Sequence, residues 1–332
     1  MAMLGKQEIT AISIVGEEGQ HTIYSTTVTG NLLCHDVRMY NHPIPPPTPL
    51  LIPSPTYSLH TGLPSGEELN AVSIGVGKVH CGGGSTNRWD FCAWTGDDLG
   101  RVVRWDRYAP NGGGSIAGVG GGRGSTHNDN ALVTCVGVRR PRGKKVRGGQ
   151  VVSGGTDCKV VLWEDRGGEG GWEGVDEINM GKVGGEGQFA NPPFVNALSW
   201  CGDDVAVGLG DGGVAILGYR GGNKRKKVKA GLFRKGRFEG GHGGGVGAVA
   251  WGVGWGGEEE GKGRWVLSGG NEGNICIWDV NAGAMRDGVR KGGKGPNGVC
   301  GLSGRGGTGG GGKVVEVGEG GVKIWDFGWK EG

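Results

Sequence analysis

The sequence predicts an all-β fold made of one repeated unit, and three observations lead to this prediction. A segment of constant length and spacing recurs along the chain, an apolar run precedes each copy, and glycine-rich stretches separate the copies. Alternating apolar residues interrupted by Gly, Asn or Asp are typical of two strands joined by a tight turn. Regular repetition of such a unit indicates a fold assembled from equal parts.

The repeated segment is clearest in three copies, in which a small hydroxyl residue precedes a tryptophan by ten positions. These copies are residues 95–106, 153–164 and 268–279. Three weaker copies keep the same length, and they are residues 25–36, 207–218 and 315–326. The six copies predict six hairpins of two strands each.

The turn of each hairpin has its own residue pattern. One position of the turn is glycine in five copies, namely Gly30, Gly100, Gly212, Gly273 and Gly320, and Cys158 takes this place in the third copy. The preceding position is acidic in four copies, namely Asp157, Asp211, Glu272 and Glu319. Glycine tolerates the backbone angles of tight turns, and a carboxylate can accept hydrogen bonds from its own turn.

A further strand is predicted upstream of each hairpin. The apolar runs that predict it are residues 9–14, 69–74, 131–136, 195–200, 246–251 and 297–302. Three strands therefore recur in one order. A fourth, outer strand is expected from the long linkers, although no residues are assigned to it.

This pattern resembles the WD-repeat family, whose Trp-Asp pair stands at Trp105-Asp106, Trp278-Asp279 and Trp325-Asp326, with Trp163-Glu164 close to it. The resemblance implies a β-propeller, in which small sheets called blades pack radially around a channel. Six blades are recognisable. Propellers of this family usually have seven, and the first hairpin corresponds to their second blade, so the sequence is expected to begin one blade late.

The resemblance also assigns a structural role to one histidine. A Gly-His pair at 241–242 precedes the first strand of the clearest unit. In the resembled fold this histidine joins the serine and tryptophan of its blade, here Ser268 and Trp278, and Glu272 replaces the usual aspartate. His242 is therefore expected to be structural rather than catalytic.

The chain is predicted to form a single propeller over residues 1–332 with long loops rich in Gly and Pro. It contains 80 Gly and 13 Pro among 332 residues, a content that approaches low-complexity sequence. Flexible insertions are expected at about 39–66, 107–130, 166–190 and 220–237. The proline-rich stretch at 43–49 could also be a polyproline ligand, but a surface linker is the favoured interpretation.

Two basic runs stand out against a net charge of only +3. Residues 220–237 hold nine basic and no acidic residues, centred on Lys224, Arg225, Lys226 and Lys227, and a second run lies at 139–147. Such runs suit nuclear import or phosphate contact, whereas the alternative is a solvated linker. Neither run is expected to offer aromatic rings for stacking on bases, so nucleic-acid binding is only weakly supported.

No catalytic, metal or cofactor site is predicted. Nucleophile-elbow, P-loop and zinc-protease motifs are absent, the seven histidines have no ligand spacing, and the eight cysteines form no C-x-x-C pair. The cysteines are interpreted as buried thiols, and no cofactor is expected. No apolar run is long enough for a signal peptide or a membrane span, so an intracellular location, in the nucleus, the cytoplasm or both, is expected.

The predicted function is a non-catalytic scaffold that binds other proteins. In a sharper form it is the substrate receptor of a cullin-4 type ubiquitin ligase, because receptors of the resembled family dock on the ligase adaptor through a Trp-Asp-x-Arg box. Two partial boxes are candidates for adaptor binding: Asp36 with Arg38, and Trp163 with Glu164 and Arg166. The alternative is a nuclear nucleic-acid- or chromatin-associated scaffold that uses the two basic runs.

Overall fold

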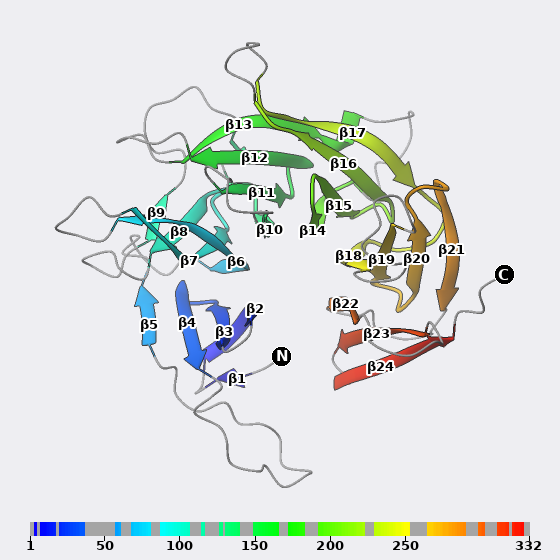
Figure 1. Ribbon diagram of the computed structural model, residues 1–332, viewed down its shortest axis with the longest axis horizontal. Helices are drawn as coiled ribbons and strands as arrows, with labels where there is room; N and C mark the ends of the chain where they lie inside the picture. Colours follow the sequence, from blue (N-terminus) through cyan, green and yellow to red (C-terminus); the bar gives the residue numbers. More distant parts are fainter. Residues whose placement is uncertain are drawn as a thin grey trace, which may run out of the picture. The chain divides into compact units, whose positions relative to one another are not determined.

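The structure, a computed structural model, is built almost entirely of β-strands (Figure 1). It describes residues 3–4, 7–17, 20–36, 57–60, 68–80, 87–106, 114–116, 126–128, 130–139, 149–165, 172–182, 192–222, 229–252, 264–289, 298–302, 311–318 and 321–328. Within these ranges the strands form six antiparallel sheets, and a single turn of 3₁₀ helix covers Met180–Lys182.

Within each sheet the strands follow one another in sequence order. The first sheet comprises β1 (Met3–Leu4), β2 (Gln7–Glu17), β3 (Gln20–Thr27), β4 (Asn31–Asp36) and β5 (Tyr57–His60). The second comprises β6 (Leu69–His80), β7 (Asn87–Asp97), β8 (Val102–Asp106) and β9 (Gly114–Ile116). The third comprises β10 (Val133–Val138), β11 (Gln150–Gly155), β12 (Lys159–Asp165) and β13 (Trp172–Asn179).

The remaining three sheets have the same order of strands. The fourth comprises β14 (Val195–Cys201), β15 (Asp204–Leu209), β16 (Val214–Arg220) and β17 (Gly231–Phe238). The fifth comprises β18 (Val246–Gly252), β19 (Trp265–Gly270), β20 (Ile275–Asp279) and β21 (Ala284–Val289). The sixth comprises β22 (Gly298–Leu302), β23 (Gly311–Gly318) and β24 (Gly321–Gly328).

The six predicted hairpins are confirmed, for example as β19 and β20. They are the second and third strands of five sheets and the third and fourth strands of the first sheet. The five turns that the structure describes adopt the left-handed backbone that the glycine pattern indicates. The φ angle is positive at Gly30, Gly100, Gly212 and Gly273, and it is also positive, at 61°, at Cys158. The cysteine therefore keeps the turn geometry of the glycines it replaces, although this region is unfavourable for residues with a Cβ atom.

The outer strands lie within the segments predicted as insertions, as expected from the length of these linkers. The segments 39–66, 107–130, 166–190 and 220–237 contain β5, β9, β13 and most of β17 respectively. The strand β17 lacks the alternating apolar pattern that marks a half-buried strand. In β17 the four consecutive residues 233–236 are exposed, so its sequence resembles that of a loop.

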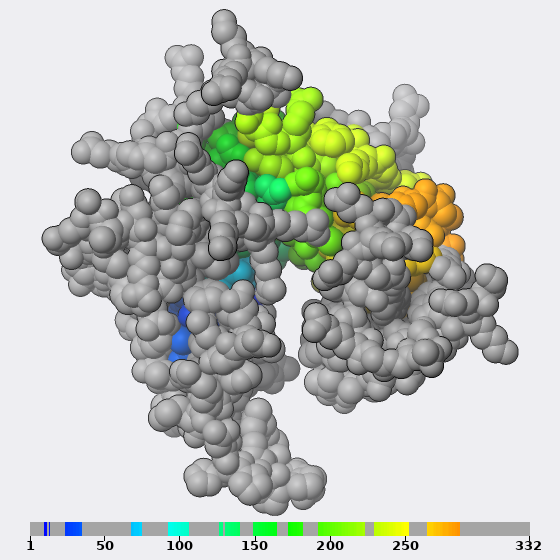
Figure 2. All heavy atoms as spheres, viewed as in Figure 1, coloured from blue at the N-terminus to red at the C-terminus, as the bar shows by residue number. Residues whose placement is uncertain are grey.

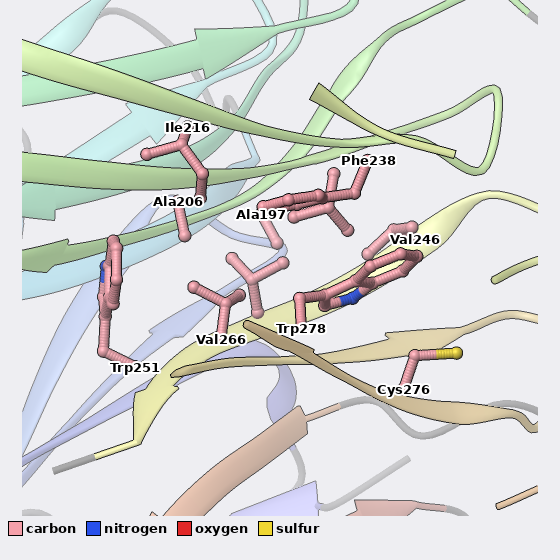
Figure 3. Close-up of a cluster of buried hydrophobic side chains, with 11 residues drawn as sticks. Ala197, Ala206, Ile216, Phe238, Val246, Trp251, Val266, Cys276 and Trp278 are labelled. Atoms are coloured by element: carbon pink, nitrogen blue, oxygen red, sulfur yellow. The ribbon is translucent and has the colours of Figure 1, made fainter. Parts of the chain in front are cut away.

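The contacts divide the chain into two compact units, each with its own core. One unit comprises residues 1–153 and 161–175, and its buried tryptophans include Trp94 and Trp172, whose rings meet edge to face at 4.2 Å. The other comprises residues 154–160 and 176–332. In its largest cluster, shown in Figure 3, the rings of Phe238 and Trp278 are stacked with their centroids 5.3 Å apart. Trp251 belongs to the same cluster.

Candidate functional site

The most complete set of polar side chains in the described residues is a buried network in the sheet β18–β21. The indole Nε1–H of Trp278 donates to Oγ of Ser268 at 2.7 Å, and the same hydroxyl lies 2.7 Å from Nε2 of His242. Nδ1 of His242 lies 2.8 Å from Oε1 of Glu272. Because a carboxylate can only accept, Nδ1–H donates to Glu272; in that tautomer Nε2 accepts from the hydroxyl of Ser268, whose oxygen accepts from the indole. These are the four residues that the sequence analysis expected to act together.

The network is closed at its carboxylate end by the backbone. Oε2 of Glu272 accepts a hydrogen bond of 3.1 Å from the amide of Gly244, so both carboxylate oxygens have partners. The side chain of His242 is 0% exposed. A histidine so enclosed cannot reach a substrate, whereas a satisfied buried network stabilises the strands that contribute to it.

A second network of the same kind lies in the sheet β10–β13, and its histidine was not predicted from the sequence. Trp163 donates to Oγ of Ser153 at 2.8 Å, and Nε2 of the buried His127 lies 2.8 Å from the same hydroxyl. His127 precedes Ser153 by 26 residues, the separation between His242 and Ser268. This spacing was a usable signal, but Thr126 stands where the family motif has glycine.

The sheet β6–β9 contains the hydroxyl–indole bond as well, between Thr95 and Trp105 at 2.8 Å. Its turn is held by the buried carboxylate of Asp97, which accepts from the amides of Leu99 and Arg101 and from Nε of Arg101. Three sheets thus use a hydroxyl residue to satisfy a buried tryptophan ten residues further along the chain.

The candidate adaptor-binding residues lie in different environments. Trp163 is 1% exposed and its indole donates to Ser153 inside the sheet. Glu164 follows it on β12 and is half-buried. Asp36 is the last residue of β4. Arg38 and Arg166 lie outside the described residues.

A third arginine occupies the same place in the repeat, and the sequence analysis missed it. Arg38, Arg166 and Arg220 each follow the last residue of a predicted hairpin segment by two positions. Arg220 is the last residue of β16 and is exposed. Gly218 stands where the other two segments have an acidic residue, and this absence of an acidic partner hid the match.

The basic run 220–237 is not a free cationic stretch at its C-terminal end. Nη2 of Arg237 lies 2.5 Å from Oδ2 of Asp211, Nζ of Lys235 lies 2.6 Å from Oδ1 of Asp204, and Arg234 donates to the carbonyl of Asn179 at 2.5 Å. Lys224, Arg225, Lys226 and Lys227 lie outside the described residues, as do residues 140–147 of the second run.

The run also contains an exposed aromatic residue, contrary to the expectation that neither run offers one. Phe233 on β17 is 44% exposed. Its ring lies against Gly218 of β16, its register partner, because a Cβ atom added to that glycine would come within 2.4 Å of Cζ of Phe233. Because glycine has no side chain, an aromatic ring opposite it can pack directly against the backbone of the neighbouring strand.

Asp204 is the centre of an ionic cluster. Its side chain is 1% exposed and contacts both Lys235 and the guanidinium of Arg264. Arg264 also lies over the ring of Trp251, with Cζ 4.8 Å from the ring centroid. A carboxylate buried this deeply needs such partners, because an unpaired buried charge is strongly unfavourable.

The thiol of Cys158 is not activated for chemistry. Burial raises its pKa above the ordinary value for cysteine, and the carboxylates of Asp157 and Asp211 raise it further. A reactive cysteine needs the opposite, an electropositive setting that favours the thiolate.

In the described part of the chain no group of three or more His, Cys, Asp or Glu side chains could hold a metal ion. The described residues also include no helix that could cross a membrane.

Comparisons with known proteins agree with the fold. No family model matches the chain, and no curated protein matches it. It is similar to two crystal structures of BBS1N in complex with ARL6DN, one soaked with mercury and one with lead. Each has a TM-score of 0.52 and 10% sequence identity. The match to the mercury-soaked structure covers 97% of this chain and 78% of the BBS1N chain. The match to the lead-soaked structure covers 98% of this chain and 80% of the BBS1N chain. At this identity the likeness concerns the fold alone, and it supports the predicted all-β architecture as a β-propeller.

Proposed function

We propose that this chain is a non-catalytic WD-repeat propeller that acts as a protein-interaction scaffold in the nucleus or cytoplasm. The observation that supports this proposal is the hydroxyl–indole bond that recurs in three sheets at the same ten-residue spacing. It uses buried hydroxyl and indole groups to stabilise the sheets. A stiff frame suits the presentation of loops to partners. The similar BBS1N was crystallised in complex with ARL6DN, which fits such a role.

The sharper form of the proposal is a substrate receptor of a cullin-4 type ubiquitin ligase. The order of sequence details is similar to that of WD repeat-containing protein 53, including the stretch 191–217 and the segment 267–281. Arg38 and Arg166 are the proposed adaptor contacts. A guanidinium can bind carboxylates or carbonyls through two parallel hydrogen bonds, which suits docking on an adaptor.

The test is affinity purification of the tagged chain from its native cell, followed by mass spectrometry of the bound proteins. We expect the cullin-4 adaptor to be recovered and to be lost with Arg38→Ala or Arg166→Ala. Lys229→Ala, which removes another exposed cation, is the matched control and should retain the adaptor. Recovery of other proteins without the adaptor would support the scaffold function and contradict the role as a ligase receptor. Recovery of no protein partner would contradict both.

The nucleic-acid alternative is weakened by the pairing of the basic run. Arg234, Lys235 and Arg237 already have partners within the protein. Binding through phosphate contacts depends steeply on salt concentration, because each contact releases condensed counterions. Binding of a duplex that falls with salt and with neutralisation of Lys224, Arg225, Lys226 and Lys227 would bring this alternative forward.

A further inference from the structure

We infer that the outer edge of the sheet β14–β17 is a docking surface for an acidic protein segment that carries an apolar anchor residue. This basic–aromatic patch consists of Arg220, Lys229, Phe233, Arg234, Lys235 and Arg264. The inference rests on the proposed scaffold function and specifies a partner for it that is independent of the adaptor. All six residues belong to the unit formed by residues 154–160 and 176–332.

Phe233 has the properties of an interface anchor. It is one of four large hydrophobic residues that are exposed in the described chain, and it is 44% exposed. The ring is held in place rather than free, because it lies against Gly218 and Nζ of Lys235 lies 5.9 Å from its centroid. Aromatic side chains with a fixed orientation dominate binding energy when a partner covers them. Yellow-green atoms from this part of the chain lie at the surface in Figure 2.

Cations lie on the strands that carry this ring and on the segments next to them. Arg220 and Lys229 are exposed, and so are Arg234 and Lys235, which also have partners within the protein. The side chain of Arg264 is 34% exposed and is paired with Asp204. The register places Arg220 opposite Gly231 and Phe233 opposite Gly218. Arg220 ends β16, Lys229 precedes β17, Arg234 and Lys235 lie on β17, and Arg264 directly precedes β19. Charged groups at the rim of an interface select partners of opposite charge and steer their approach.

The positions of the carboxylates favour an acidic protein segment over a nucleic acid. Asp204 is buried between Lys235 and Arg264 and neutralises part of their charge. Asp203 is exposed beside it, and its carbonyl accepts from the amide of Tyr219. A continuous phosphate backbone would meet this exposed carboxylate, whereas a peptide can place its acidic residues selectively. Single-stranded nucleic acids also use several stacking rings, and this patch exposes one.

The free edge of β17 is partly blocked, which specifies how a partner would bind. Oδ2 of Asp176 accepts the amide of Leu232 at 2.7 Å, and Arg234 reaches the carbonyl of Asn179 on β13. An occupied backbone amide cannot pair with an incoming strand. We therefore expect the partner to contact the side chains of the patch rather than to add a strand to the sheet.

The test is selection of short random peptides displayed on phage against the complete chain, with Phe233→Ala as the counter-selection. We expect enriched peptides that combine Asp or Glu with an aromatic or large aliphatic residue. Their affinity, measured by fluorescence anisotropy, should fall about tenfold with Phe233→Ala, as for a moderate interface hot spot. Arg220→Glu should weaken the same peptides through charge reversal.

Matched controls separate this surface from nonspecific adhesion. Met285→Ala removes another exposed hydrophobic residue, 48% exposed on β21, and should leave the affinity unchanged. Circular dichroism and the thermal midpoint should match those of the original chain for every variant.

The inference is overturned if no peptide distinguishes the chain from Phe233→Ala, or if the selected peptides are neutral or basic. It is also overturned if an oligothymidylate binds and Phe233→Ala abolishes that binding. If the Phe233→Ala variant still binds the cullin-4 adaptor, a failure of this docking surface does not contradict the proposed function.

Discussion

Trp278 and His242 share one hydroxyl group, that of Ser268, at 2.7 Å from the indole nitrogen and 2.7 Å from the imidazole nitrogen. The hydroxyl can serve both because it accepts from one ring and donates to the other. Removal of any member leaves a buried polar atom without its partner, and the cost of that loss underlies the first prediction.

His242→Ala should destabilise the chain, because it deprives the buried Ser268 and the carboxylate of Glu272 of a partner. We expect the free energy of unfolding to fall by about 1–3 kcal/mol, measured by chemical denaturation with intrinsic tryptophan fluorescence. Met285→Ala is the control and should change the free energy by less than about 0.5 kcal/mol. A thermal midpoint equal to that of the original chain would contradict the structural role of His242.

Gly270→Ala should damage the same network by steric conflict. A Cβ atom at this position would lie 2.4 Å from both Oε1 of Glu272 and Nδ1 of His242, which leaves no room for either side chain. We expect a loss of about 1–3 kcal/mol in stability, typical of overpacking. Gly243→Ala is the matched control because a Cβ atom there has no neighbour within 4 Å. Equal thermal midpoints for the two variants would show that the packing described around Gly270 is incorrect.

Gly212 and Cys158 occupy equivalent turns, but they should respond differently to alanine. Gly212 has a φ of 86°, and a Cβ atom would lie 2.8 Å from the carbonyl oxygen of His242. Gly212→Ala should therefore cost about 2 kcal/mol through strain and backbone conflict. Cys158 already has a Cβ atom in a turn with a φ of 61°, so Cys158→Ala should cost less than about 1 kcal/mol. Denaturant midpoints of both variants test the difference, and a larger loss for Cys158→Ala would contradict it.

The thiol of Cys158 should be slow to react with alkylating reagents. Its pKa is raised by burial and by Asp157 and Asp211, so less thiolate is present at a given pH than for an ordinary cysteine. We expect slow modification by iodoacetamide at about pH 8, with the midpoint of the pH–rate profile above that of a free thiol. Mass spectrometry of the peptide that contains Cys158 measures the rate. Asp211→Asn removes one negative charge and should move the midpoint to lower pH; a shift to higher pH would contradict this electrostatic account.

Part of the network could be predicted from sequence because its members lie at fixed local spacings. The separation of Ser268 from Trp278 places both on one hairpin, so a repeated motif can identify the pair. His127 escaped notice because Thr126 replaces the usual glycine before it, although its distance from Ser153 matches that of the other network. The outer strand β17 also escaped notice, because its exposed residues carry no alternating apolar pattern.

The sequence by itself determined the hairpins, their turns and the all-β class, because these features depend on residues a few positions apart. Only the tertiary structure decided which charges are free. Lys235 and Arg264 appear independent in the sequence, yet both reach the buried carboxylate of Asp204. The structure also decided that Phe233 is held at the surface by Gly218. Ion pairing and exposure depend on distances between separate strands, which are set by sheet register and packing and not by local sequence.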